Sequence, residues 1–484
     1  MIRPEPRRAP WATARARDAF AVRPAAAVAT VAAAVGAALA VAVPEARAGG
    51  FALIEHGASG MGNAYAGAGA LAEDGSTVWF NPAGMTELPD REVTVAGHVL
   101  GTDPEWRDEG TSLSPLVGGG PVSGPDTADP GTTSFLPNLY YSAPINERWH
   151  YGLGIGVPFG SSTEYDANWK GRYTTIESGV QVIDINPSIA YRLSDAVRLG
   201  AGVSLQFLSA DLTSAVDSGA VCLGVIEESA ACVNAGLTPG VQENDGLGEI
   251  TGDSTAVTVN LGALFLPRDG TRIGVAFRSG ASHELDGDGD FTTNEDLRAL
   301  LDAQGGGVEA LLTDSGAEAE IDLPPSLSLS AVQRLHEDVD LLADLTWQGW
   351  SSFQELRVDY DNPAQPDTVS IQDYDDVFRV SVGVNWRQSP RLLLRAGLAY
   401  DEEAIPGPER RTARIPGNDR TWLAFGAGYR FSDNLSIDAG YAHLFLPETA
   451  IDNQNLETTG GAIVRGLYES SVDIFSAQLR YQFR

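Results

Sequence analysis

Three carboxylates at alternate positions have the residue type and the spacing of metal ligands. The stretch ELDGDGDF places Asp286, Asp288 and Asp290 as in the first half of a calcium-binding loop. Such a loop needs a glycine where Phe291 stands and a glutamate where Leu297 stands. We therefore interpret the aspartates as a solvated acidic part of a loop, and we expect no metal site.

Residue types suited to covalent chemistry are present but poorly spaced. The stretch GASGM, from Gly57 to Met61, misses the nucleophile motif G-x-S-x-G at its last position, so a lipase is only an alternative. Gly60 and Gly62 suggest a nucleotide-binding loop, but no strand precedes them and neither a third glycine nor a lysine follows at the required spacing. None of the six histidines stands in a local catalytic motif: His56, His98, His150, His283, His336 and His443. We expect a protein that is not an enzyme and holds no cofactor.

The N-terminus has the organisation of a secretion signal. Arginines precede an alanine- and valine-rich core from Ala25 to Val43, and a small-residue cleavage site follows at residues 46–48. Because Pro44 and this site directly follow the core, a cleaved signal peptide over residues 1–48 is favoured over a retained membrane anchor. Gly49 would then be the first residue of the mature chain.

Cysteine usage and charge narrow the compartment and the partners. Cys222 and Cys232 are close in sequence, and a disulfide closing a short loop is the expected state of two such cysteines in a secreted chain. The formal net charge of −33 argues against nucleic acid as a partner. Mean hydropathy is −0.10, and no apolar run beyond the N-terminus reaches the length of a membrane helix, so a helical membrane protein is not expected.

From residue 92 onward, apolar and polar residues alternate in segments of about ten residues, which is the period of strands with two different faces. In Val197–Phe207, for example, Leu199 and Val203 share one face, and Ser204 and Gln206 share the other. The same alternation recurs in residues 378–387, 422–431, 435–442 and 473–483. Alternation alone fits both a soluble sandwich and a membrane barrel.

The connections between these strands distinguish the two architectures. Six tight turns are expected at residues 144–148, 194–196, 267–270, 336–338, 388–390 and 432–434. They alternate with seven long loops at residues 101–133, 158–175, 210–254, 282–320, 349–376, 402–419 and 446–471. Fourteen antiparallel strands in an up-and-down order, with all long loops at one end, are typical of an outer-membrane barrel. Residues 91–484 are therefore predicted to form an all-β transmembrane barrel, closed because hydrocarbon offers no partner to an unpaired edge.

Residues 49–90 lack the alternation and are rich in small residues, so we expect them to lie as a plug in the lumen. The motif GGFALIEHGASGMGNAYAGAGALAEDGSTVWFNPAGM resembles the N-terminal hatch of the FadL-type outer-membrane transporters of long-chain fatty acids, whose relatives import aromatic hydrocarbons. The resemblance continues through PNLYYSAPINERWHYGLGIGVPFGSSTEY and IDLPPSLSLSAVQRL to IPGNDRTWLAFGAGYRF, and it covers essentially the whole mature chain.

The resemblance implies roles for two parts of this hatch. It implies that Asn81, Pro82 and Ala83 form a turn near an opening in the barrel wall. It also implies that the new N-terminus, with Phe51, inserts toward the ligand pocket and moves to release ligand. From the residues alone, Asn81 and Pro82 are explained as well by an ordinary turn, in which asparagine bonds locally and proline restricts φ.

Three further sets of residues suggest ligand contact, each with a structural alternative. Glycines on one face of the strand 149–157 indicate either a kink against the hatch or packing room for it: Gly152, Gly154 and Gly156. Leucines at helical spacing in the loop 282–320 either line a capture groove, as the resemblance suggests, or only pack loop helices: Leu297, Leu300, Leu301 and Leu311. Lumen-facing arginines either meet a substrate carboxylate or pair with luminal acids: Arg198, Arg379, Arg395, Arg430 and Arg480.

The sequence thus predicts passive uptake of long-chain fatty acids or similar apolar compounds, such as aromatic hydrocarbons, through a hatch-gated barrel with lateral release. The expected location is the bacterial outer membrane. The expected partners are the ligand, outer-membrane lipid and the barrel-assembly machinery, and the expected state is a monomer. A general diffusion porin, which would need an open hydrated lumen, is the main alternative, and an outer-membrane lipase is the other.

Overall fold

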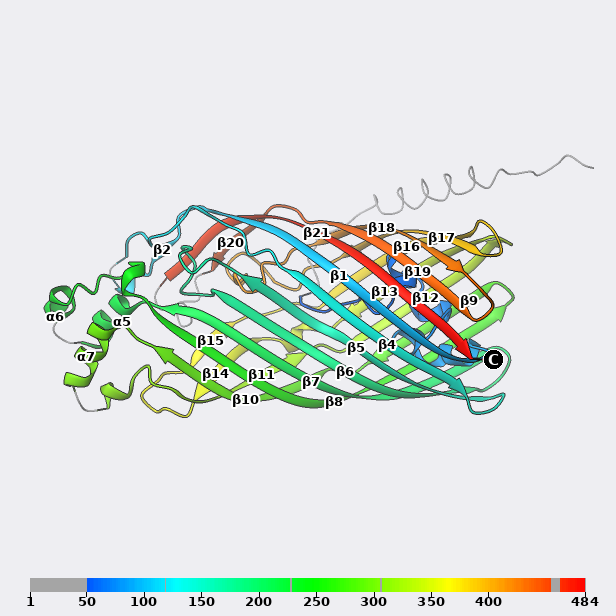
Figure 1. The fold of residues 1–484 in the computed structure, drawn as a ribbon, viewed down its shortest axis with the longest axis horizontal. Helices are drawn as coiled ribbons and strands as arrows, with labels where there is room; N and C mark the ends of the chain where they lie inside the picture. The colour runs from blue at the N-terminus through cyan, green and yellow to red at the C-terminus, as the bar shows by residue number, and fades with distance from the viewer. Residues whose placement is uncertain (1–49, 118, 227–228, 305–306, 454–461, 484) are drawn as a thin grey trace, which may run out of the picture. The chain divides into compact units, whose positions relative to one another are not determined.

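The computed structural model describes residues 50–117, 119–226, 229–304, 307–453 and 462–483. The predicted signal peptide and Gly49 lie outside the described residues. The described strands form one antiparallel wall in sequence order, and β21 pairs with β1 to close it (Figure 1). This confirms the predicted fold class, a closed barrel of 14 strands.

Some wall strands are continuous and others are interrupted. The continuous strands are β1 (Arg91–Asp108), β4 (Thr133–Pro144), β5 (Trp149–Glu164), β6 (Glu177–Arg192), β7 (Val197–Val216), β8 (Gly246–Arg268), β17 (Leu392–Asp401), β18 (Arg420–Arg430) and β21 (Ala462–Phe483). The interrupted strands are β9 with β10 (Thr271–Arg278, Ala281–Thr292), β11 with β12 (Ser315–Leu323, Ser326–His336), β13 with β14 (Val339–Gln348, Glu355–Tyr360), β15 with β16 (Thr368–Ile371, Val377–Arg387) and β19 with β20 (Leu435–Phe445, Thr449–Asn453). The short strands β2 (Ser112–Leu113) and β3 (Thr127–Ala128) lie between β1 and β4.

The two faces of the wall have the polarity of a membrane barrel. On β7, Leu199 and Val203 are exposed on the outside, whereas Ser204 and Gln206 are buried on the inside. An apolar outer face suits hydrocarbon, and a polar inner face suits a lumen that holds water or a polar plug. The alternation in the sequence therefore identified the correct two faces.

Several strands run further than the sequence pattern predicted. β7 extends to Val216 and β8 begins at Gly246, so the predicted loop 210–254 is reduced to residues 217–245. The register between the two strands continues without a shift up to the Val216–Gly246 pair. Apolar residues stop alternating where strands leave the bilayer, although the hydrogen-bond ladder continues in water, and this is why the pattern missed the extension.

Helices outside the barrel wall are short and lie in the loops. They are α5 (Ser218–Val225), α6 (Ser229–Asn234), α7 (Glu295–Gln304) and the 3₁₀ segments η2 (Pro115–Val117), η3 (Gln242–Asn244), η4 (Val308–Ala310) and η5 (Trp350–Ser352). Figure 1 shows α5, α6 and α7 at one end of the barrel, opposite the end at which β21 stops. No helix of the described residues is long and apolar enough to cross a bilayer.

Residues 50–88, which we call the luminal segment, lie inside the barrel. They include α2 (Ala58–Met61), α3 (Ala68–Leu71), α4 (Thr77–Phe80) and η1 (Pro82–Glu87). The segment touches the wall at glycines, since a Cβ on Gly397 of β17 would lie 2.2 Å from the Asn63 carbonyl and a Cβ on Gly200 of β7 would lie 2.3 Å from the Ala83 nitrogen. Any larger wall residue at these positions would displace the segment.

Candidate functional site

A cavity of about 660 Å³, which we call the inner cavity, lies beside the start of the luminal segment. Its lining includes the aromatic side chains of Phe51 and Trp79, together with three arginines: Arg278, Arg379 and Arg420. A space of this size that combines apolar lining with charged and polar side chains can hold a small molecule.

A second cavity, of about 1050 Å³, lies among the loops and is called the outer cavity. Most of its lining is apolar and includes Val221, Val225, Phe291, Leu311, Leu356 and Val358. Phe51 lines both cavities, as does Ile415. Phe51 therefore stands at the boundary between the outer and the inner cavity.

Phe51 is held there by an aromatic cluster. Its ring centroid lies 4.9 Å from that of Trp350 and 6.1 Å from those of Phe159 and Phe353. The Phe51 side chain is buried in this cluster. Dispersion and edge-to-face contacts hold it, so the contact has no directional hydrogen bond that would oppose a rearrangement of the ring.

The barrel wall is interrupted beside the inner cavity, between β4 and β5. The β4–β5 ladder stops at the Leu139–Ile155 pair, although both strands continue. On its other side β5 shifts register against β6 between Gly156 and Phe159. Residues on both sides of this break, including Leu136 of β4, line the inner cavity. We call this interruption the wall break.

The three glycines singled out in β5 lie at and below the wall break. A Cβ on Gly152 would lie 2.5 Å from the Met85 sulfur, and a Cβ on Gly156 would lie 2.4 Å from the Asn138 side chain. Gly154 faces the Tyr140 ring, at 3.2 Å from an added Cβ. Both structural explanations considered for them, a bend and packing room for the segment, are present together.

The turn at Asn81, Pro82 and Ala83 combines a local cap with a contact to the wall. Asn81 Oδ1 accepts from Ala83 N at 3.1 Å, while Asn81 Nδ2 donates to Gly69 O at 2.7 Å and to Ala263 O of β8 at 3.0 Å. The turn lies against β7 and β8, and Pro82 also lines the inner cavity, so its expected place near an opening stays a prediction. The following η1 helix reaches β5 through Met85.

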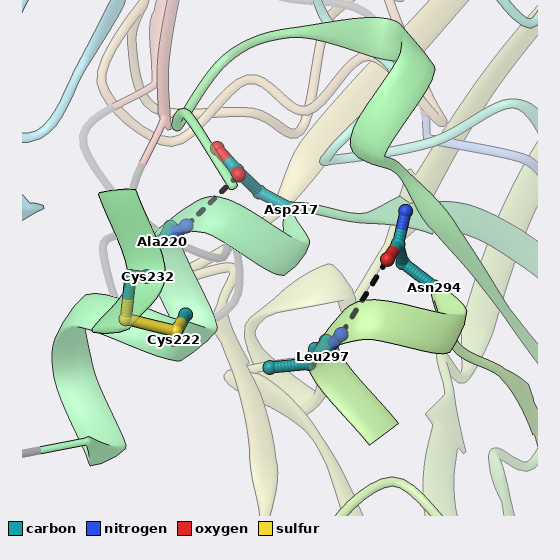
Figure 2. The surroundings of a disulfide bond; sticks show 6 residues. All are labelled: Asp217, Ala220, Cys222, Cys232, Asn294 and Leu297. Carbon is teal, nitrogen blue, oxygen red and sulfur yellow. Dashed lines mark hydrogen bonds between the residues drawn. A yellow bond between two sulfur atoms is a disulfide. The ribbon is translucent and has the colours of Figure 1, made fainter. Parts of the chain in front are cut away.

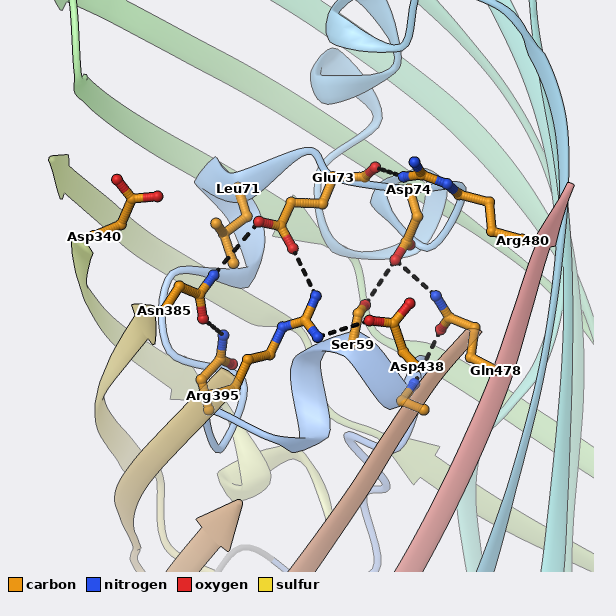
Figure 3. A network of polar contacts seen from close by, with 12 residues as sticks. Ser59, Leu71, Glu73, Asp74, Asp340, Asn385, Arg395, Asp438, Gln478 and Arg480 are labelled. Atoms are coloured by element: carbon orange, nitrogen blue, oxygen red, sulfur yellow. Dashed lines mark hydrogen bonds and ion pairs between the residues drawn. The ribbon is translucent and has the colours of Figure 1, made fainter. Parts of the chain in front are cut away.

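A network of charged and polar groups joins the luminal segment to the wall strands β17, β19 and β21 (Figure 3). Arg395 of β17 bonds Glu73 of the segment at 3.1 Å and Asp438 of β19 at 2.7 Å. Asp74 accepts from Gln478 of β21 at 2.7 Å and from Ser59 at 2.7 Å. Charge-assisted bonds of this kind are stronger than neutral ones, so this part of the segment is firmly held.

The five predicted luminal arginines have different environments. Arg198 pairs with Glu87, and Arg395 belongs to the network described above. Arg480 donates to the Glu73 carbonyl, whereas Arg430 is exposed at the end of β18. Arg379 is the exception that matters for ligands, because its Nη2 donates to Ala64 O but its Nε and Nη1 have no partner among the described residues.

The other two arginines of the inner cavity have acidic neighbours. Arg420 pairs with Asp401 at 2.9 Å, and Arg278 lies 3.9 Å from Asp184. Among the described residues, Arg379 is thus the arginine of the inner cavity without an ion pair within 4 Å, although it is near enough to Glu55 and Asp344 of the same cavity to interact with their charges. An unpaired buried cation is costly unless an anion reaches it.

The loop leucines divide between packing and lining. Leu297 and Leu301 are fully buried beside the disulfide, which favours packing for them, and Leu300 packs against the same cluster. Leu311 lines the outer cavity. Figure 2 shows the N-terminal ends of α5 and α7. At the start of α5, the Asp217 side chain accepts a hydrogen bond from Ala220 N at 2.9 Å.

The structure pairs Cys222 with Cys232 in a disulfide, as the sequence predicted. The bond joins α5 to α6 within the same buried loop cluster (Figure 2). Both sulfurs are buried, so the disulfide is a structural bond of the outer loops rather than an exposed redox centre.

The described residues include one serine–histidine contact. His98 Nδ1 lies 2.6 Å from Ser476 Oγ, which is the serine–histidine pair that a lipase would need. However, no carboxylate among the described residues bonds this histidine, and neither residue lines the two cavities. The described part of the chain also holds no cluster of three or more metal-ligating side chains, and Asp286 lies in β10 rather than in a loop.

Sequence reasoning missed several residues that shape the site. Trp350 and Phe353 come from the excursion between β13 and β14, about 300 residues from Phe51, and nothing in their spacing indicates the contact. Trp79 stacks on His56 at 4.0 Å and carries the Arg278 guanidinium at 3.5 Å on its ring. Neither the alternation of a strand nor the hatch motif indicates which residues distant in the sequence will be in contact.

Known outer-membrane proteins are similar in sequence to this chain over most of its length. The family described as "Outer membrane protein transport protein (OMPP1/FadL/TodX)" matches residues 39–483. The chain is 29% identical over 396 residues to the long-chain fatty acid transport protein of Escherichia coli O6:H1 (strain CFT073), covering 82% of this chain and 86% of that protein. It is 29% identical over 421 residues to outer membrane protein P1 of Haemophilus influenzae (strain Rd), with the same shares of 82% and 86%.

Solved structures have the same architecture. A Pseudomonas aeruginosa FadL homologue matches with a TM-score of 0.79 and 26% identity, over 90% of this chain and 100% of that one. The Pseudomonas putida toluene transporter TodX matches in fold with a TM-score of 0.63 and 18% identity, over 90% of this chain and 99% of that one. The chain therefore belongs to the FadL and TodX family of outer-membrane transport proteins, and its barrel spans the bacterial outer membrane.

Proposed function

We propose that this protein carries long-chain fatty acids, or closely similar apolar carboxylates, from the outer cavity through the inner cavity and sideways through the wall break into the membrane. Residues 49–90 act as the hatch. The protein performs no chemistry on the ligand, needs no energy source and works as a monomer that the barrel-assembly machinery inserts among outer-membrane lipids.

The inner cavity with its unpaired Arg379 is the observation that carries this proposal. A sixteen-carbon chain gains about 0.8 kcal/mol per buried methylene, hence on the order of 12 kcal/mol on leaving water. The apolar part of a cavity that leads toward the bilayer offers this gain, whereas a water-filled pore does not. A carboxylate on the same molecule can pair with Arg379 once its guanidinium turns toward the cavity, because the buried Nε and Nη1 have no hydrogen-bond partner among the described residues.

Phe51 supplies the gate in this proposal. Its ring stands at the boundary of the two cavities, and weakly directional aromatic contacts hold it. Displacing the ring would join the cavities. A general diffusion porin is disfavoured, because residues 50–88 occupy the lumen in contact with strands on different sides of the wall.

The names of the relatives cover two ligand classes. The Escherichia coli relative is by its name a long-chain fatty acid transporter, and the TodX structure is that of a toluene transporter. Arg379 supports the acid over the neutral hydrocarbon, because toluene has no group that could pair with a guanidinium.

The test is uptake of labelled oleate and labelled toluene by cells that lack their own fatty-acid transporter. Wild-type protein should take up oleate, and Arg379→Met should reduce oleate uptake at least tenfold while leaving any toluene uptake unchanged. Arg430→Met is the matched control, since Arg430 is exposed outside both cavities. Uptake of toluene alone, or free passage of small sugars, would refute the fatty-acid proposal.

A further inference from the structure

The outer cavity is apolar over most of its lining but contains one cationic side chain. Among the described residues that line it, the only lysine or arginine is Arg414, from the loop 402–419. The next residue, Ile415, lines both cavities, as does Phe51. Arg414 therefore belongs to the part of the outer cavity that leads to the inner one.

The protein itself uses only part of the Arg414 guanidinium. Its Nη1 donates to Thr175 Oγ1 at 3.3 Å and to Glu177 O at 3.4 Å, which are long distances for hydrogen bonds. Its Nε and Nη2 bond no atom in the described part of the chain. The side chain is half-buried, and these nitrogens are not sealed from solvent as the free nitrogens of Arg379 are. Arg414 therefore has donors that a molecule in the outer cavity can reach.

The two acids among the described lining residues of the outer cavity are bound to other groups. Asp217 accepts hydrogen bonds from two backbone nitrogens, at 2.9 and 2.8 Å. Asp367 pairs with Arg357 at 2.9 Å. Burial lowers the pKa of Arg414 to about 10, so its guanidinium stays charged at neutral pH. A charge in such a place is stabilised when an anion from outside the chain binds it.

Neighbouring arginines of the same loop have acidic partners. Arg410 pairs with Asp373 at 2.7 Å, and Arg411 pairs with Glu403 at 2.6 Å. Neither arginine lines the outer cavity. Arg414 thus differs from them in both respects, and it stands beside apolar walls. This combination matches a long-chain carboxylate, whose hydrocarbon part contacts the walls while its head group forms charge-assisted bonds with the guanidinium.

We propose that Arg414 is a specificity-determining residue of the outer cavity, where it binds the carboxylate of an entering fatty acid before the ligand reaches Arg379. The two arginines form successive sites for the same group, one reached from the loops and one enclosed beside the inner cavity. A neutral hydrocarbon gains no such contact at Arg414. This inference rests on the proposed function, because it concerns the same ligand on the same route.

The concentration dependence of oleate uptake tests this role. Arg414→Met should raise the oleate concentration that gives half-maximal uptake about tenfold, because a charge-assisted bond is lost. The maximal rate should stay within about twofold of wild type, since saturating ligand compensates for weaker capture. Arg414→Lys keeps the charge and should recover most of the loss. Arg410→Met is the matched control, because Arg410 lies in the same loop but outside both cavities.

Binding to the purified protein separates this role from transport. Sodium decanoate and decanol are titrated by calorimetry into the protein in detergent, with Arg379→Met in every sample so that the unpaired guanidinium of the inner cavity is absent. Adding Arg414→Met should weaken decanoate binding about tenfold and leave decanol binding unchanged, because the two compounds differ only in the head group. Equal weakening of both compounds would show that the side chain only shapes the cavity, and would overturn the proposal.

The two measurements distinguish failure of this inference from failure of the proposed function. If wild-type protein takes up oleate and Arg414→Met has the same half-maximal concentration, the role of Arg414 is refuted and the proposed function stands. If decanoate binding depends on Arg414 but cells with wild-type protein take up no oleate, the carboxylate site is supported and the proposed function is refuted.

Discussion

Asn81 offers a sharp test of whether the luminal segment is tied to the wall. Its amide is fully buried and makes three hydrogen bonds, of which the one to Ala83 N caps η1 and those to Gly69 O and Ala263 O are donated by Nδ2. An ordinary N-cap tolerates Asp as well as Asn, and its loss to Ala costs about 1 kcal/mol. A donor to two buried carbonyls cannot be replaced by a carboxylate.

The two substitutions at this position should therefore rank in an unusual order. Asn81→Ala leaves the buried Ala83 nitrogen and Gly69 carbonyl without their partner, at about 1–3 kcal/mol each, and removes the half-buried bond to Ala263 O, so the segment should be destabilised by about 3 kcal/mol or more. Asn81→Asp keeps the cap but sets negative charge against the carbonyls of Gly69 and Ala263, so it should be worse still.

Hydrogen exchange of the purified protein in detergent measures this directly. Peptides within residues 57–88 should exchange roughly 100-fold faster in Asn81→Ala, since each 1.4 kcal/mol is about tenfold, and faster again in Asn81→Asp. Asn146→Asp is the control, because Asn146 accepts from two backbone amides in an exposed turn and donates to no buried carbonyl in the described chain. Wild-type exchange in Asn81→Asp would refute the reasoning and leave Asn81 as a local cap.

Three shorter predictions concern the wall and the loops. Gly200→Ala should lower the stability of the protein in detergent by about 1–3 kcal/mol, because its Cβ would lie 2.3 Å from the backbone of the luminal segment, whereas Gly179→Ala, with nothing within 4 Å, should be neutral in the same denaturation assay. Cys222→Ser should destabilise the loop 217–245 by about 2–4 kcal/mol and speed its proteolysis, while the barrel keeps its heat-modifiable migration on gels. Burial raises the pKa of Asp419 to about 6, so the folded loop 402–419 favours the protonated acid and should lose protection from hydrogen exchange as the pH rises through 6. Asp419→Asn should remove this pH dependence. A loop that gains protection as the pH rises through 6 would contradict the prediction.

Much of the barrel could be predicted because its physics is local. A strand between lipid and lumen must alternate in polarity, as Leu199 and Ser204 do on β7, and the short turns and long loops follow from strand order. The disulfide followed in the same way from two nearby cysteines in a secreted chain. Such features depend on residues that are neighbours in sequence.

The parts of the site that could not be predicted depend on distant partners. Arg379 and Arg430 follow the same alternation, yet one is buried without an ion pair and the other is exposed, because β18 ends where Arg430 stands. Asn138 looks like any luminal polar residue of β4, and only the end of the β4–β5 ladder beside it gives it a particular place. A period-2 pattern reports which face a residue occupies, and nothing about its partner across the lumen.

The most direct test of the central claim is a crystal structure of the protein with a dibrominated stearate, in which anomalous scattering locates the two bromines. We expect bromine peaks inside the inner cavity, with the carboxylate of the same molecule within hydrogen-bonding distance of Arg379. Ordered bromine only on the outer surface of the barrel, or a carboxylate bound away from Arg379 with the inner cavity filled by water, would refute the proposed route of the ligand.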